Sequence, residues 1–220
     1  MRLLKHPGYT PEQVRKALRY HAKRLKSRPA TKPFAKAIQT HADTIRLAQD
    51  AVEDADFDVQ AATGEIAVLD DDLGKAFRPL TLGLDQLVGG VADDPRRRRL
   101  FATTPSEALK PTVGDDQSQF VDDVLKVLTN EGDFETLKPH AAAIVAAHDA
   151  LKAKVAERAG LRSTLALAES NLAKVVQAAC IAHNESEPDV KKLVGASNKK
   201  LVESFFYKFP PAAKKVAAPE

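Results

Sequence analysis

The stretch that decides the fold is residues 34–88, FAKAIQTHADTIRLAQDAVEDADFDVQAATGEIAVLDDDLGKAFRPLTLGLDQLV. Large aliphatic residues recur there at every seventh position, and a second set, mostly small or apolar, lies midway between them on the same helical face. The first set is Ile38, Ile45, Val52, Val59, Ile66, Leu73, Leu80 and Leu87; the second is Phe34, His41, Ala48, Ala55, Ala62, Leu69 and Ala76. About eight heptads in phase predict a long α-helix that packs along a seam with another helix.

Two residues inside this stretch oppose a single unbroken helix. Gly64 costs about 1 kcal/mol in a helix interior, and Pro79 lacks a backbone donor and typically kinks a helix. A hairpin at Gly64 is therefore the competing arrangement. We favour one helix over residues 34–88, because a turn has no reason to preserve the heptad phase on both sides. Such a helix would extend about 80 Å.

Outside this stretch the chain shows further helix signals. Thr10-Pro11-Glu12-Gln13 combines an N-cap hydroxyl, a proline at the first helical position and a capping-box partner, so it predicts the start of a short helix over residues 11–26. Hydrophobic periodicity predicts a second short helix over 119–130 and a second long helix over 136–184. The resulting division is a first helical unit 1–90, a polar loop 91–116, a second unit 117–186, and an amphipathic and partly disordered tail 187–220.

An ungapped shift of 99 residues aligns the two long periodic runs. His41 meets His140, Ile45 meets Ile144, and Asp50 meets Asp149. We interpret this as an internal duplication of a short-helix plus long-helix unit, with chance similarity between coiled-coil-like segments as the alternative. The predicted fold is an all-α, elongated antiparallel bundle in which each short helix covers part of the seam.

The composition agrees with long helices and limits the compartment. Hydrophobic residues make up 44% of the chain, aromatic residues only 5%, and there is no Trp. The single cysteine excludes an internal disulfide, and no apolar run reaches the roughly 18–20 residues of a membrane span. Because the N-terminus also lacks the apolar region of a secretory signal, we expect a cytoplasmic protein. The basic, acid-poor residues 1–36 also fit an organellar transit peptide.

The net charge of +3 conceals blocks of opposite sign. Residues 1–36 contain eleven Lys and Arg against Glu12 alone, whereas residues 37–95 contain thirteen Asp and Glu against three basic residues. Since neighbouring blocks of opposite charge can neutralise one another after folding, we expect the basic segment 11–28 to pair with the acidic face of 43–72.

Motifs that support catalysis are not visible in the sequence. It lacks a phosphate-binding glycine loop, a nucleophile elbow, zinc-ligand spacing and the paired Glu-x-x-His motifs of a di-iron bundle. His41 and His140 fall at seam positions and could bind a metal or titrate near neutrality. Without an accompanying carboxylate set, they are interpreted as core or boundary histidines, and Cys180 as an unreactive thiol. We expect no enzyme activity, no cofactor, no metal site and no small-molecule substrate.

Two functions from different classes remain. The favoured one is a structural or protein-interaction bundle with a scaffold or assembly role, which binds a protein partner or forms a homo-oligomer. The alternative is a non-specific nucleic-acid-binding protein. Its expected contacts would be Arg15, Arg19, Lys23, Arg24, Arg96, Arg97, Arg98 and Arg99. The aromatic residues Phe205, Phe206, Tyr207 and Phe209 either cap one end of the bundle or dock onto another chain.

Overall fold

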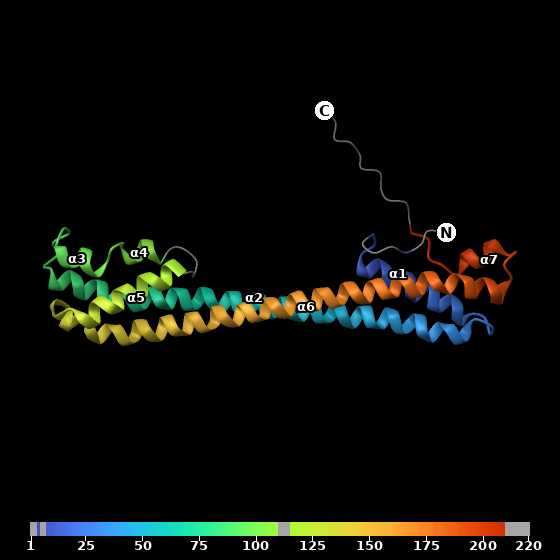
Figure 1. Cartoon of the computed structure of the whole chain (residues 1–220), viewed down its shortest axis with the longest axis horizontal. Coiled ribbons are helices and arrows are strands. Elements are labelled where there is room, and N and C mark those ends of the chain that lie inside the picture. The colour runs from blue at the N-terminus through green and yellow to red at the C-terminus, as the bar shows by residue number, and fades with distance from the viewer. Residues whose placement is uncertain (1–3, 5–7, 110–114, 210–220) are drawn as a thin grey trace, which may run out of the picture. The chain divides into compact units, whose positions relative to one another are not determined.

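Helices are the regular secondary structure of the described part of the chain. The computed structural model describes residue 4, residues 8–109 and residues 115–209. It is 84% helical and has no strand within those residues, so the predicted all-α bundle is confirmed. The helices are α1 (Pro11–Lys26), η1 (Lys32–Phe34), α2 (Ala35–Leu87), α3 (Pro95–Leu100), α4 (Pro105–Ala108), α5 (Asp115–Asn130), η2 (Gly132–His140), α6 (Ala141–Val194) and α7 (Lys199–Ser204) (Figure 1).

The heptad stretch forms one helix of 53 residues, α2, which continues without a break through Gly64 and Pro79. This excludes the hairpin alternative. Its seam is buried largely as the heptads predict. The buried members are Ile38, Ile45, Ala48, Ala55, Ala62, Ile66, Leu73 and Leu80. Phe34 differs, because it precedes α2 in the short helix η1 and is 42% exposed.

The predicted start of α1 is also confirmed. The Thr10 hydroxyl accepts a hydrogen bond from the Gln13 backbone at 3.2 Å, and the Gln13 side chain accepts one from the Thr10 backbone at 2.9 Å. The two side chains therefore satisfy backbone N–H groups that the helix itself leaves without partners.

The chain divides into two compact units, each with its own core. The first unit contains residues 1–55 and 165–220, and the second contains residues 56–164. This differs from the sequence-based division into units 1–90 and 117–186. The reason is that α2 and α6 pair, so the start of α2 shares a core with the end of α6, and the end of α2 shares the other core with the start of α6.

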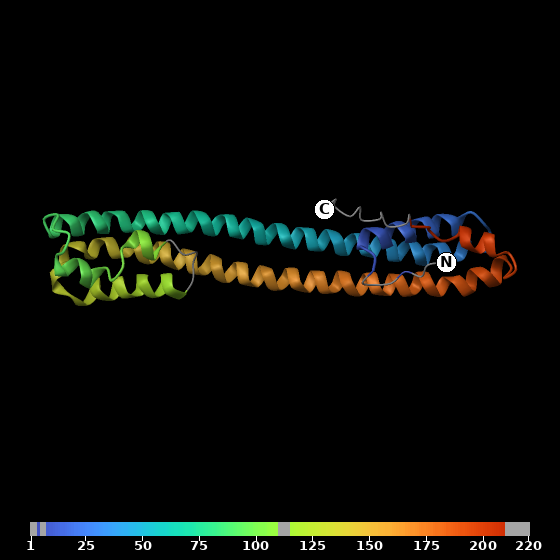
Figure 2. The same cartoon turned by 90° about the horizontal axis from the view of Figure 1, so that it is seen from above.

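A short helix completes each core. In the first unit, α1 buries Val14, Leu18 and Leu25 against α2 and α6 (Figure 2, dark blue). In the second unit, α5 lies along α2 and α6 and contributes Val121 and Leu128 (Figure 1). The order of short helix and long helix thus occurs twice, although the proposed duplication stays a prediction.

Several boundaries differ from those predicted. The second long helix, predicted over 136–184, is α6 over Ala141–Val194, and the 3₁₀ helix η2 precedes it. The segment 91–116, expected as a loop, contains α3 and α4, and α3 starts where the Asp94 carboxylate caps the Arg96 backbone N–H at 2.8 Å. The helix expected over 119–130 begins at 115. The expected tail from 187 is helical through Val194, past Pro188, and again in α7. Residues 210–220, the end of that tail, lie outside the described residues.

One helical segment, Gly132–Val194, is long enough and apolar enough in composition to cross a membrane. The mean hydropathy of its most apolar window of 18 residues is 1.2. A single helix of this kind is weak evidence of a membrane span, because a core helix of a bundle passes the same test.

Candidate functional site

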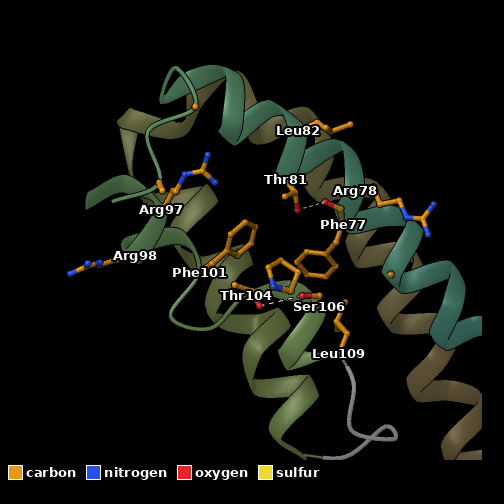
Figure 3. Close-up of a pocket in the computed structure, with 14 residues that line it drawn as sticks. Phe77, Arg78, Thr81, Leu82, Arg97, Arg98, Phe101, Thr104, Ser106 and Leu109 are labelled. Atoms are coloured by element: carbon orange, nitrogen blue, oxygen red, sulfur yellow. Dashed lines mark hydrogen bonds between the residues drawn. The ribbon is translucent and has the colours of Figure 1, made fainter. Parts of the chain in front are cut away.

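The second unit contains a pocket of about 920 Å³ between α2 and the short helices α3 and α4 (Figure 3). The pocket is lined mainly by apolar groups, together with a few hydroxyl and guanidinium groups. The lining residues are Gly74, Phe77, Arg78, Thr81, Leu82, Gly90, Ala92, Arg97, Arg98, Phe101, Thr104, Pro105, Ser106 and Leu109. A volume of this size is within the range of about 300–1,000 Å³ that is usual for small-molecule sites.

An aromatic cluster supports the pocket from the core side. The ring centroids of Phe77 and Phe101 lie 6.5 Å apart, and Phe120 of α5 is 5.6 Å from Phe77 and 6.3 Å from Phe101. Phe77 is buried in the second core, whereas Phe101 is half-buried and faces the pocket. The two phenylalanine rings of the pocket are therefore held by packing with Phe120 of α5.

Arg97 is the one arginine of the pocket that reaches inward in Figure 3, where it lies near Phe101. Its guanidinium forms an ion pair with Asp85 of α2, and its Nε donates to the Val91 carbonyl oxygen at 2.9 Å. Arg78 and Arg98 extend away from the cavity. Since a guanidinium carries five N–H groups, Arg97 is held in place and keeps donors for a further acceptor.

The four arginines expected to contact nucleic acid in the Arg96–Arg99 run all pair with carboxylates of the same unit. Arg96 pairs with Asp94 at 2.8 Å, Arg98 with Asp93 at 3.4 Å, and Arg99 with Glu131 at 3.2 Å and Asp133 at 2.6 Å. The Arg96 side chain, with its backbone N–H, lowers the pKa of Asp94 to about 2. The positive charges of the Arg96–Arg99 run are therefore paired with carboxylates within the unit.

The expected contacts on α1 fall into two groups. Arg15 is half-buried and pairs with Glu12 at 2.6 Å, and Arg24 donates to the Ser204 carbonyl and hydroxyl oxygens at 3.1 Å each. Arg19 and Lys23 are exposed, and they form a basic stripe with Lys16 and Lys26 at helical spacing.

The expected pairing of α1 with the acidic face of 43–72 was wrong. No ion pair joins α1 to that face among the described residues. The buried side of α1 is apolar and packs in the first core, so its basic stripe points to solvent. Residues 56–72 also belong to the other unit.

The aromatic cluster after α7 lies against its own chain. Phe205 and Phe206 are buried in the first core, which is the cap arrangement. Tyr207 is half-buried, with its ring 5.7 Å from that of Tyr20, and Phe209 stacks on Tyr9 at 4.4 Å. The two phenylalanines that would anchor a docking peptide are therefore occupied within the first unit.

The two seam histidines lie in different units of the chain. His41 belongs to the first unit and His140 to the second, and each is half-buried. A different pair, His21 and His183, is buried in the first core with ring centroids 5.2 Å apart. Because the two residues are far apart in the sequence, no local sequence pattern indicates that they are neighbours. Only the correct packing of α1 on α6 brings them together.

The buried pair is electrostatically unusual. Burial lowers the pKa of His183 to about 4, with His21 as a second cause, and burial also lowers the pKa of His21. His21 is hydrogen-bonded to the Phe205 carbonyl oxygen and the Ser186 hydroxyl, both at 2.9 Å. The Nε2 atom of His183 is buried without a hydrogen-bond partner among the described residues. Both rings are therefore neutral at physiological pH.

The nearby thiol does not add a reactive group. Cys180 is buried, and burial raises its pKa, so it is not activated as a thiolate. Among the residues described, no group of three or more His, Cys, Asp or Glu side chains is arranged to hold a metal ion.

The chain was compared with protein-family models, curated proteins and solved structures. None of the three comparisons found a match.

Proposed function

We propose that this chain is a non-enzymatic, cytoplasmic protein-interaction protein that assembles with a second copy of itself. The contact would be made by residues 56–69 of α2 and 151–164 of α6, called here the two-helix stretch. In the neighbouring part of α2, Leu73, Phe77, Leu80, Leu84 and Val88 are buried. In the two-helix stretch, the described hydrophobic residues that are fully buried are Ala62, Ile66 and Leu151. The core is therefore thinner here than in that neighbouring part of α2.

An exposed apolar face of α2 is the observation that carries the proposal. Phe57 is 70% exposed and Val68 is 61% exposed. Ala61 and Gly64, also exposed, lie between them at spacings of four, three and four residues, which places all four on one side of the helix. Large aromatic residues exposed on a contiguous apolar face are typical of association surfaces.

The charges of the two-helix stretch favour a second copy as the partner. Residues 56–69 contain three acidic and no basic residues, whereas residues 151–164 contain four basic residues and one acidic residue. Within the chain, Lys154 pairs with Glu65 at 2.7 Å, but Asp56, Asp58, Lys152 and Arg162 make no ion pair among the described residues. In a two-fold dimer, the acidic segment of α2 in each copy could lie beside the basic segment of α6 in the other copy. The symmetry then gives two such contacts between opposite charges.

The test is the sedimentation of the whole chain and of two variants at micromolar concentration. The double change Phe57→Ser and Val68→Ser should give a monomer with unchanged helical content, because both side chains are exposed in the single chain. Leu47→Ser is the control, since Leu47 is similarly exposed on α2 outside the stretch. A dimer that persists in the double variant, or a monomeric unmodified chain, would refute the proposal.

A second candidate function, polyanion binding, is favoured by the charge of the first unit. That unit holds 20 Lys and Arg against 11 Asp and Glu, a net charge of +9, whereas the second unit holds 13 against 19. The basic stripe of α1, Lys16, Arg19, Lys23 and Lys26, has no ion-pair partner among the residues described. Phosphate contacts by such a stripe would be salt-sensitive and independent of base sequence.

This candidate is tested by titrating salt against binding to random-sequence DNA and RNA. Changing the four stripe residues to Gln should weaken binding strongly and flatten its salt dependence. The matched control changes Arg96, Arg98 and Arg99 to Gln, because these three already pair with carboxylates. Equal losses in both variants, or no binding by the unmodified chain, would exclude the α1 stripe as a polyanion site.

A further inference from the structure

We infer that the pocket of the second unit binds an amphipathic carboxylate, a molecule with an apolar tail or ring and one anionic head group. The inference is independent of self-association, because the pocket residues lie outside the two-helix stretch. The apolar part would lie against Phe77, Phe101 and Leu109, and the carboxylate would accept hydrogen bonds from Arg97.

The shape of the pocket supports the apolar part of the ligand. Phe77 comes from α2 and Phe101 directly follows α3, and Figure 3 shows both rings directed into the space between these elements. Gly74 lies on the α2 wall, where a Cβ atom would meet no other atom within 4 Å. The wall therefore leaves open space that an apolar ligand can fill.

The polar groups support an anionic head. Arg97 is fixed by Asp85 and the Val91 carbonyl oxygen, so little side-chain freedom is lost when it binds an acceptor. Arg78 and Arg98 stand at the rim, and Asp93 pairs with Arg98 at 3.4 Å. Asp85, Asp93 and Glu107, which is bonded to the Thr104 hydroxyl, balance the three arginines in number. The preference for a carboxylate therefore comes from Arg97, the guanidinium that reaches inward in Figure 3.

The hydroxyl groups of the pocket are less available than Arg97. The Thr81 hydroxyl donates to the Phe77 carbonyl oxygen at 3.0 Å, and the Thr104 hydroxyl donates to Glu107 at 2.8 Å. Because both protons are engaged within the chain, these groups can accept but not donate without rearrangement. Arg97 is thus the group that selects the charge of the ligand.

The experiment is calorimetric titration of the full chain with decanoate, kept below its micelle-forming concentration, and with decyltrimethylammonium, which has the same tail and the opposite charge. We expect saturable binding of one decanoate per chain and at least about tenfold weaker binding of the cation, since a charge-assisted hydrogen bond is gained in one case only. Absence of saturable decanoate binding, or equal affinity for both probes, overturns the inference.

A pair of glycine variants locates the site. Gly74→Leu places a side chain in the pocket and should weaken decanoate binding at least about tenfold. Gly132→Leu is the control, because Gly132 belongs to the same unit and has equally open surroundings but lies outside both the pocket and the two-helix stretch. Equal weakening in both variants, or in neither, contradicts binding at this pocket. Circular dichroism of each variant verifies that α2 remains helical.

Discussion

The imidazole rings of His21 on α1 and His183 on α6 lie 5.2 Å apart, and both contact Phe206, which stacks on His21 at 4.6 Å. Three segments distant in sequence are thereby joined in the first core. Because both rings are buried and their pKa values are lowered, folding requires them to be uncharged.

The stability of the protein should therefore decrease on mild acidification. The pKa of His183 is about 4 in the folded chain against 6.5 for a free histidine, so the unfolded state binds protons more readily below pH 6.5. From pH 7 to pH 5 this histidine alone lowers the free energy of unfolding by about 2 kcal/mol, and the loss continues until pH approaches 4. Denaturant titration at several pH values measures the effect.

The control for this prediction is His183→Leu, which removes the titrating ring and retains an apolar side chain. The variant should lose most of the difference in unfolding free energy between pH 7 and pH 5. If the unmodified chain is equally stable at both pH values, or if the variant shows the same pH dependence, the buried pair does not determine the acid sensitivity.

Substituting alanine for two glycines of α2 should have opposite effects on the free energy of unfolding. Gly64→Ala should raise the free energy of unfolding by about 1 kcal/mol, because alanine is the better helix former and its Cβ atom would meet no neighbour. At Gly83 a Cβ atom would lie 2.7 Å from Leu137 Cδ2, so Gly83→Ala should give no gain or a loss. A destabilised Gly64→Ala variant would contradict a continuous, open helix at that position.

The terminal aromatic residues should contribute unequally to stability. Phe206→Ala removes a buried ring from between two histidines and should cost about 3–5 kcal/mol. Tyr207→Ala removes a half-buried ring next to Tyr20 and Lys16 and should cost clearly less. Chemical unfolding of both variants tests the cap arrangement, and a Phe206→Ala chain as stable as the unmodified one would favour docking onto another protein.

The periodic parts of the chain were predictable, because heptad spacing and capping depend on local sequence. The residues of α2 fall largely where the pattern places them, and α1 begins at the capping box. Lys154 of α6 is half-buried although it is charged, and its ammonium group lies 2.7 Å from carboxylate oxygens of both Glu65 and Glu157.

The candidate sites could not be predicted, because they depend on contacts between distant segments. The pocket needs α3 and α4 to fold over α2 within a segment that has no hydrophobic period. The sequence alone suggests that Arg96–Arg99 is a free basic cluster. In the structure, however, Arg99 pairs with Glu131 and Asp133, which lie much later in the sequence. The His21–His183 pair likewise becomes visible only once α1 is packed on α6.

A charge exchange between two variants tests the proposed assembly most directly. One variant carries Asp56→Lys and Asp58→Lys in α2, and the other carries Lys152→Glu and Arg162→Glu in α6; all four residues are exposed. Each variant alone places like charges across the proposed dimer contact, so sedimentation should show monomers. Their equimolar mixture should restore a dimer, because opposite charges then meet at both contacts. Dimers of either variant alone, or a mixture that stays monomeric, would contradict the pairing of α2 with α6 of a second copy.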